Sequence, residues 1–494
     1  MASSPSHAVA PAVPAESFGE GARDDYTTSA VPLSARRSTL NMTLVWITGN
    51  AAFSTLYTGY SLYQGGFSLT DMLIASLVGD AILGIYWFFA AYLGSRFGQT
   101  ETLLARTFLG RSGSMVVSAL IIIASVGWYS FQANLLGIAI SSLAGVSGDV
   151  KIISLGAGII MMFNNAFGFR SVSAWAKWIA APILILWVLW AFAKVFVETP
   201  SSQLYATPHI AGAVGFGVAV STFIGAVIWG SEPDFWRWSK PKPSASIVPI
   251  VVALVLGNVL FPLAGAALAA SRNLTDFGHV ISYITSYTLG FAAIGVIIFV
   301  ITQVATNDLN LYEVVTAAKN LFKGPRIVYV VVFGLIGSVF AYFQVINHYT
   351  TIAELTGVLV PCVTVVMILD AFAVPRLFGI RRPADTVTAW ASAGLANVPG
   401  LVAIAAGLVV GGFTGGIFTA STTWGIGPLQ AWAATSVVYL AGVAVVKALT
   451  QGETRDRLLG FPLTARNLAP HPEGAVQDAA GLPAQPGPTV AGAP

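Results

Sequence analysis

The sequence predicts an all-α integral membrane protein with twelve transmembrane helices. Its composition is the first indication, because 55% of the 494 residues are hydrophobic and only 9% are charged, whereas a soluble domain carries about 25% charged residues. The second indication is a series of apolar runs, each with roughly the 20 residues that a helix needs to cross a bilayer. The expected spans are 41–63, 70–94, 113–143, 151–170, 174–197, 211–232, 246–270, 287–314, 327–346, 350–371, 387–411 and 428–449.

The third indication is the distribution of positive charge. All but three of the 24 Lys and Arg residues lie before the first apolar run, in every second loop or after the last run; the exceptions are Lys151, Lys194 and Arg272. Cytoplasmic loops of membrane proteins carry such an excess of positive charge. The alternation therefore supports twelve spans, and it predicts a multi-pass protein of the cell membrane with both termini in the cytoplasm.

Composition and span count divide the chain into five segments. The two end segments are expected to be disordered cytoplasmic tails, because they are rich in small and polar residues and lack apolar periodicity. The expected segments are the N-terminal tail 1–35, spans 1–5 in 36–200, spans 6–10 in 201–375, spans 11–12 in 376–450, and the C-terminal tail 451–494. Residues 272–287, between spans 7 and 8, are mildly amphipathic and are expected to form an interfacial helix.

Spans 1 and 6 both carry a cluster of residues that interrupts a membrane helix. Span 1 contains Gly49-Asn50 followed by several small polar residues, and span 6 runs through Gly225, Gly230 and Ser231 to Glu232-Pro233. Backbone groups freed by such breaks must be satisfied inside the protein or by a ligand. Breaks five spans apart indicate two inverted repeats, spans 1–5 and 6–10, with the substrate at the broken helices. The alternative is that these small residues serve only helix packing.

Polar side chains at membrane depth are the candidates for binding residues. Trp128 and Gln132 in span 3 are four residues apart and share one helix face. An indole and an amide suit a flat, polar heterocycle, because the ring stacks and the amide both donates and accepts. The alternative is a core tryptophan beside a glutamine that bridges two helices. Further candidates are Thr302, Thr306, Asn307, Asp308 and Asn310 in span 8, Phe223, Trp229 and Glu232 in span 6, and the isolated acids Asp80 and Glu354.

Several classes of function find no support. The chain lacks a GxxxxGK[ST] phosphate-binding motif, and its five histidines lie in tails, loops or span ends. No catalytic constellation stands out, so we expect neither an enzyme nor an ATP-driven pump. The net charge of +3 follows from loop topology and does not indicate nucleic-acid binding. The expected partners are a small heterocyclic substrate, a coupling cation and the lipid bilayer.

Several short motifs occur together over roughly residues 31–375. They are Val31-Pro32, Ser34-Ala35-Arg36, Leu83-Gly84-Ile85-Tyr86, Leu103-Leu104-Ala105-Arg106 with Phe108 and Gly110, Val126-Gly127-Trp128, Asp234-Phe235, Thr306-Asn307-Asp308 with Leu311-Tyr312, and Pro361 to Asp370. With these motifs the chain resembles the nucleobase–cation symporter-1 family, which includes the purine-cytosine permeases. The resemblance implies a LeuT-type 5+5 inverted repeat plus two C-terminal helices. It also implies import of a nucleobase, hydantoin, allantoin or related vitamin with a sodium ion or proton.

The resemblance also implies roles for single residues. Trp128 matches the tryptophan that stacks on the substrate ring, and Gln132 matches an amide used by hydantoin and fungal purine-cytosine members. Phe223 matches an aromatic residue that faces the substrate, with Trp229 as the competing candidate. Asn307 and Asn310, which are polar residues at membrane depth in span 8, are expected in the same water-accessible substrate site.

Four positions depart from the cytosine permeases. Ser125 stands at a base-binding glutamine, Gly225 at a serine and Thr302 at an asparagine, so that cytosine itself is in doubt as the substrate. Ala305 stands where a sodium-binding hydroxyl is usual, which weakens the case for sodium because sodium prefers a full shell of hard oxygen ligands.

The coupling ion stays open between sodium and a proton. The expected sodium ligands are Thr306 and carbonyls near Phe53, and Asp308 or Glu232 is the expected proton carrier. No other cofactor is expected. A non-transporting sensor on the same scaffold remains the alternative to a transporter.

Overall fold

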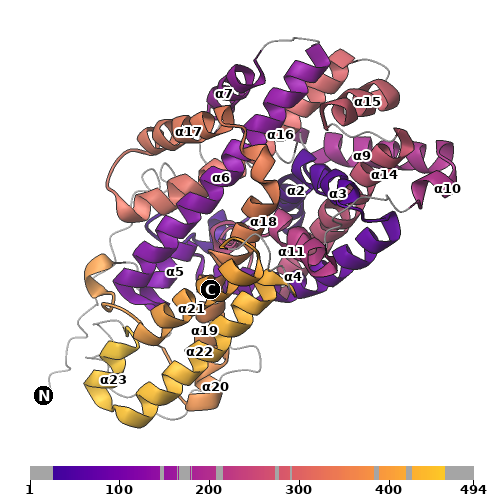
Figure 1. Ribbon diagram of the computed structural model, residues 1–494. Helices are drawn as coiled ribbons and strands as arrows, with labels where there is room; N and C mark the ends of the chain where they lie inside the picture. Colours follow the sequence, from indigo (N-terminus) through magenta and orange to yellow (C-terminus); the bar gives the residue numbers. More distant parts are fainter. Residues whose placement is uncertain are drawn as a thin grey trace, which may run out of the picture.

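The computed structural model describes residues 26–144, 149–163, 165, 178–179, 181–206, 215–272, 277–289, 292–382, 389–418 and 425–461. Within these ranges the chain is helical, and β-pairing is limited to two isolated bridges. Figure 1 shows a bundle of long helices, elongated along one axis. This agrees with the expected all-α architecture.

Span 1 is broken, as the sequence predicts. Helix α2 (Thr39–Asn50) ends at Ala51, and α3 (Phe53–Gln64) begins after Ala52, whose φ of −135° and ψ of 168° are extended. The hydroxyl of Thr55 satisfies the freed groups: its Oγ1 donates to the carbonyls of Ala52 (2.8 Å) and Asn50 (3.2 Å) and accepts from the amide of Ala52 (3.3 Å). The break is therefore stabilised within the protein.

Span 6 is broken in the same way. Helix α11 (Phe216–Val227) and the short α12 (Pro233–Trp236) are separated by residues 228–232. Gly230 has a φ of +80°, a conformation that favours glycine. The indole Nε1 of Trp229 donates to Asn50 Oδ1 at 3.2 Å. The two breaks therefore lie side by side, as an inverted repeat requires.

The remaining α-helices complete the bundle. They are α4 (Leu69–Phe97), α5 (Glu101–Phe108), α6 (Gly110–Ala144), α7 (Val150–Met161), α9 (Ala181–Glu198), α10 (Ser201–Leu204), α13 (Pro243–Ala253), α14 (Phe261–Arg272), α15 (Phe277–Leu289), α16 (Ala292–Leu321), α17 (Arg326–Tyr342), α18 (Tyr349–Val358), α19 (Pro361–Phe372), α20 (Val374–Phe378), α21 (Val398–Thr414), α22 (Gly427–Leu449) and α23 (Gly452–Leu458). A π-helical segment, Leu254–Leu260, joins α13 to α14. The loop expected to form an interfacial helix does contain a helix, α15.

Helices of the two repeats interlock around the breaks. Helices α6 and α16, which form spans 3 and 8, run beside one another over much of their length (Figure 1). Span 1 packs against span 7, where a Cβ on Gly59 would lie 1.7 Å from the carbonyl oxygen of Pro262. Only glycine allows that approach, as is usual where membrane helices meet closely.

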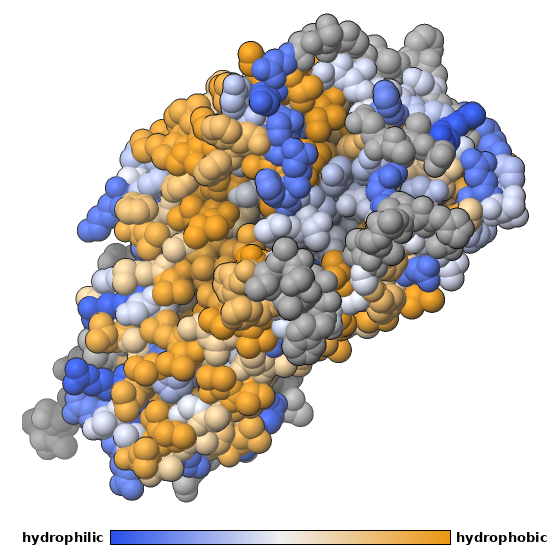
Figure 2. Space-filling view, viewed as in Figure 1, coloured by the Kyte–Doolittle hydropathy of each residue, from blue (hydrophilic) through white to orange (hydrophobic). Residues whose placement is uncertain are grey.

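The exterior is suited to a lipid environment. Among the described residues, five helices are both long and apolar enough to cross a membrane. Figure 2 shows apolar side chains over the part of the visible face where Figure 1 places α17, α6 and α22. Exposed large side chains such as Ile85, Trp190 and Val437 fit this assignment, since lipid tails are the solvent there.

The structure adds a kink to span 10 and moves two expected boundaries. Residues Val345–Phe372 form one apolar span, and a turn at residues 359–360 separates α18 from α19 within it, because Pro361 lacks the N–H that would continue the helix. Residues 26–35 are not part of a free tail, since the buried Val31 donates its N–H to the Gly98 carbonyl at 2.8 Å. Residues 451–461 likewise form α23 and a bridge from Leu459 to Asn397.

Some expectations fall outside the described residues. They are tail residues 1–25 and 462–494, most of the stretch from the second half of span 4 to the start of span 5 (residues 164 and 166–177), and the first residues of spans 6 and 11.

Candidate functional site

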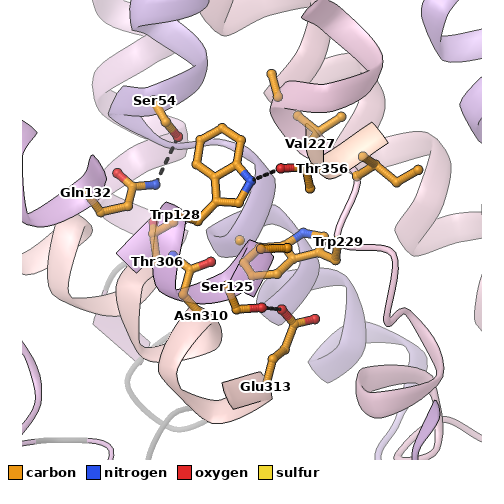
Figure 3. A pocket seen from close by; sticks show the side chains of 14 residues that line it. Ser54, Ser125, Trp128, Gln132, Val227, Trp229, Thr306, Asn310, Glu313 and Thr356 are labelled. Atoms are coloured by element: carbon orange, nitrogen blue, oxygen red, sulfur yellow. Dashed lines mark hydrogen bonds between the residues drawn. The ribbon is translucent and has the colours of Figure 1, made fainter. Parts of the chain in front are cut away.

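A cavity lies between the two breaks and helices α6, α16 and α18. Figure 3 shows the indoles of Trp128 and Trp229 in its centre, with Gln132 and Ser54 toward one end and Ser125 and Glu313 toward the other. Both indoles are at least nine-tenths buried. The lining residues are Gly49, Ser54, Ala124, Ser125, Trp128, Gln132, Ala226, Val227, Ile228, Trp229, Thr306, Asn310, Glu313 and Thr356.

Helix α6 supplies three of the expected residues. Ser125, Trp128 and Gln132 follow the i, i+3, i+7 spacing of one helix face, and all three line the cavity. The indole Nε1 of Trp128 donates to Thr356 Oγ1 at 2.7 Å, which fixes the ring through span 10. This orientation leaves the cavity with a flat apolar surface.

Gln132 also joins helices. Its Nε2 donates to Ser54 Oγ at 3.1 Å, and its Oε1 accepts from Gln303 Nε2 at 2.9 Å. The amide therefore bridges spans 1, 3 and 8 and lines the cavity as well. An amide has two donor hydrogens and two acceptor lone pairs, so it keeps capacity for a ligand.

Span 6 presents Trp229 rather than Phe223 to the cavity. Helix α11 ends at Val227, and the extended backbone of Ile228 carries the next side chain inward. Phe223 is fully buried one turn earlier and does not line the cavity. Gly225 does not line it either, because it packs against the backbone of Ala353. Of the two aromatic candidates, only Trp229 meets the cavity.

Span 8 divides its polar residues between two faces. Thr306 and Asn310 line the cavity. Asn307 does not, since its Nδ2 donates to the Tyr129 carbonyl at 3.3 Å. Thr302 lies a turn above and donates to the Ile298 carbonyl at 2.9 Å. Asp308 is buried outside the cavity, about 200° around the helix from Thr306 at 100° per residue.

Glu313 is the one carboxyl among the described residues that line the cavity, and the sequence analysis missed it. Its Oε2 accepts from Ser125 Oγ at 2.8 Å, and its Oε1 accepts from Ser231 Oγ. Its side chain is 1% exposed. Thr306, Asn310 and Glu313 have i, i+4, i+7 spacing, so they also share one helix face. The spacing could have indicated Glu313 as a site residue. It was not considered, because it lies at the expected end of span 8, where charged residues are common.

Thr306 stands where the sequence predicts a sodium site. Its Oγ1 donates to the carbonyls of Thr48 (3.0 Å) in span 1 and Thr302 (3.1 Å). The ring of Phe53 packs against that of Phe299, with 3.7 Å between centroids and a tilt of 33° between the planes. Ala305 adds no side-chain oxygen. A hydroxyl that already ties span 1 to span 8 fits a sodium ion only in part, because hard cations need several oxygen ligands.

Glu232 is occupied by structural hydrogen bonds and does not line the cavity. Its Oε1 accepts from the indole of Trp87 (2.9 Å) and from the amides of Trp229 (3.1 Å) and Gly230 (3.0 Å), and its Oε2 accepts from the Tyr86 hydroxyl (3.1 Å). Asp80, which accepts from Asn258, and Glu354 also lie outside the cavity. Glu232 therefore holds the break of span 6 in shape.

The comparison with known families decides the class of protein. A family model described as permease for cytosine/purines, uracil, thiamine and allantoin matches residues 30–426. The chain belongs to this family. It is therefore a membrane permease and not an enzyme.

Two curated relatives agree with this assignment. Cytosine permease of Escherichia coli (strain K12) is 27% identical over 402 residues, which cover 79% of this chain and 92% of that protein. Purine-cytosine permease FCY2 of Saccharomyces cerevisiae is 24% identical over 327 residues, 59% of each chain.

Solved structures establish the fold. The transporter Mhp1, a nucleobase-cation-symport-1 member described in a closed conformation with bromovinylhydantoin bound, gives a TM-score of 0.66 at 16% identity, covering 88% of this chain and 98% of that one. A Na⁺-coupled sialic acid symporter gives a TM-score of 0.57 at 11% identity, covering 83% and 90%. The permease thus has the LeuT-type inverted-repeat fold that the broken spans indicate.

Proposed function

We propose that this permease imports a nucleobase or related planar N-heterocycle across the cell membrane, together with a cation, by alternating access. The observation that carries the proposal is the cavity between the two broken spans, with an indole from each repeat. It is the place where inverted-repeat transporters bind substrate. Members of the matching family are named for such heterocycles.

The lining residues suggest how the substrate is held. The ring stacks on Trp128 and meets Trp229, and its polar edges bond to Gln132, Asn310 and Ser125. Aromatic surfaces hold flat rings with little dependence on the ring's identity, so the amide and hydroxyl groups set the specificity. The roles of Phe223, Gly225, Thr302 and Asn307 are then to pack the helices that form the cavity.

We infer that both termini are cytoplasmic. The first and last described segments contact the loops that carry the positive charge. Arg36 donates to the Ser239 carbonyl at 3.2 Å, and Arg382 donates to the Leu459 carbonyl at 2.7 Å. These contacts support the proposal, because the positive-inside rule assigns loops rich in Lys and Arg to the cytoplasm.

The coupling ion is proposed to be a proton. The hydroxyl of Thr306 already bridges spans 1 and 8, where a sodium ion would otherwise join them. A carboxyl group in the site supplies a proton carrier instead. Sodium stays the competing candidate, because a structural neighbour is a Na⁺-coupled transporter.

A ligand screen followed by uptake tests the proposal. Purified protein would be heated with nucleobases, hydantoins, allantoin and pyrimidine vitamins, since a ligand that binds the native state raises its apparent stability. Positive ligands would then be labelled and offered to proteoliposomes. We expect uptake above that of protein-free vesicles. Binding without uptake would indicate a sensor instead.

A further inference from the structure

Glu313 occupies an unusual place in the cavity. It is the only carboxyl among the lining residues, and none of these described residues is Lys, Arg or His. An ionised carboxylate beside two indoles with no cation to pair with is costly. The cost disappears when the carboxyl carries a proton or meets a cationic ligand. Binding of a ligand in the cavity is therefore linked to whether the Glu313 carboxyl carries a proton.

The hydrogen-bond partners of Glu313 allow it to gain and lose a proton. Both are serine hydroxyls, Ser125 and Ser231, and a hydroxyl can donate or accept. Protonation only reverses one of these bonds. Glu232 differs at its Oε1, where an indole and two amide N–H groups donate and cannot accept, although its Oε2 accepts from the Tyr86 hydroxyl. Because Glu232 does not line the cavity, Glu313 is the carboxyl whose proton a ligand in the cavity can meet.

Other ionisable groups lie near Glu313. Glu232 and Asp234 from the end of span 6, and Glu101 from α5, are buried acids that interact with it through space. Arg237 is the nearby cation, but it acts on Asp234. Asp308, on the same helix, does not line the cavity. Glu313 therefore differs from these groups in lining the cavity.

We propose that Glu313 binds the substrate as a neutral carboxyl and carries the coupled proton. This inference rests on the proposed function and deepens it. The carboxyl O–H donates to an acceptor on the heterocycle, and the carboxyl C=O accepts from the N–H or NH₂ beside it. Amidine and lactam edges both present such an adjacent pair. The O–H bond of Glu313 forms with a proton taken up from outside together with the substrate, and it breaks when that proton is released to the cytoplasm after the substrate; no bond of the substrate changes.

This mode of binding defines the substrate class. It takes neutral planar N-heterocycles with an acceptor next to a donor, such as cytosine, uracil or adenine. It rejects anionic heterocycles such as orotate, because the cavity offers no cation for their carboxylate. Glutamine at position 313 would present the same donor and acceptor without a titrating proton.

The test measures binding of the ligand from the cytosine, uracil and adenine set that binds most tightly, in choline buffer from pH 5.5 to 9.5. Wild-type affinity is expected to fall as pH rises, approaching about tenfold per unit once Glu313 must take up a proton. Glu313→Gln is expected to bind with an affinity independent of pH, and Glu313→Leu to lose at least tenfold. Asp308→Asn is the matched control and should keep the wild-type slope.

The outcomes separate this inference from the proposed function. A wild-type affinity that stays constant over the range would overturn the role of Glu313, and this measurement needs no variant. A slope that survives in Glu313→Gln but vanishes in Asp308→Asn would overturn it as well. In both cases the bound heterocycle leaves the proposed function intact. Failure of every heterocycle to bind would contradict the proposed function and this inference together.

Discussion

Single residues fix what the cavity can bind, and Gln132 has two tasks there. It faces the cavity and also bonds to Ser54 and Gln303. Its remaining hydrogen-bonding capacity is directed toward a ligand, so its contribution to binding should depend on the ligand's polar edge. Its contribution to the stability of the protein comes from Ser54 and Gln303 and should be the same whichever ligand is tested.

Gln132→Leu is therefore expected to weaken binding selectively for ligands with an amide-like edge. A buried polar group left unpaired costs about 1–3 kcal/mol, which corresponds to roughly tenfold or more in affinity. Calorimetric titration with amide-bearing and amide-free ligands measures the difference. Gln303→Leu is the control, since it removes a partner of Gln132 without lining the cavity. Equal losses for all ligands would assign Gln132 a structural role only.

Much of the site follows from helical spacing in the sequence. Ser125, Trp128 and Gln132 share one face of α6, and they meet in the cavity. The choice between Phe223 and Trp229 could not be made in this way, because it depends on where α11 stops. Thr356 comes from a third helix, and no local pattern brings it to Trp128. Contacts within one helix are thus readable, and contacts set by breaks and tertiary packing are not.

At the level of elements, the break in span 6 depends on Glu232. This carboxylate accepts four hydrogen bonds, two of them from backbone amides that the break leaves without helical partners. In the core of a membrane no water is present to form hydrogen bonds with such backbone groups. The carboxylate therefore stabilises the irregular segment that carries Trp229.

Glu232→Ala is expected to lower the melting temperature, because four buried donors lose their acceptor at about 1–3 kcal/mol each for those that find no other. Glu232→Gln should lose less, since its amide oxygen still accepts from the backbone. Thermal unfolding of the purified protein measures both. Glu453→Ala, on the exposed surface of α23, is the control. A melting temperature unchanged in Glu232→Ala would refute this role.

The sequence analysis predicts the breaks in spans 1 and 6 but not the kink in span 10. Glycine, serine and threonine mark the first two, because they tolerate or satisfy irregular backbone. The turn at residues 359–360 lies between apolar residues, and Pro361 is its mark in the sequence. The sequence analysis also placed the tail boundaries too far into the chain. Composition does not show that Val31 and Leu459 contact residues distant in sequence, Gly98 and Asn397.

For the whole molecule, the ion is the open question with the sharpest test. Substrate uptake would be measured at fixed pH with sodium replaced by choline. We expect uptake to persist, because a proton carried by Glu313 makes sodium unnecessary. Uptake that collapses without sodium would contradict proton coupling. In that case Ala305→Thr should strengthen the dependence on sodium by restoring a hydroxyl beside Thr306.

The central claim is that the cavity around Trp128 is the transport site. Counterflow tests it most directly, because vesicles loaded with unlabelled heterocycle exchange it for labelled heterocycle without any ion gradient. Stacking on an aromatic ring contributes about 1–3 kcal/mol per base. Trp128→Ala should therefore require roughly tenfold to a hundredfold more ligand for half-maximal exchange, and Trp128→Phe less. Trp190→Ala, on the exposed face of α9, should match the wild type. A folded Trp128→Ala protein that exchanges ligand like the wild type would contradict the account.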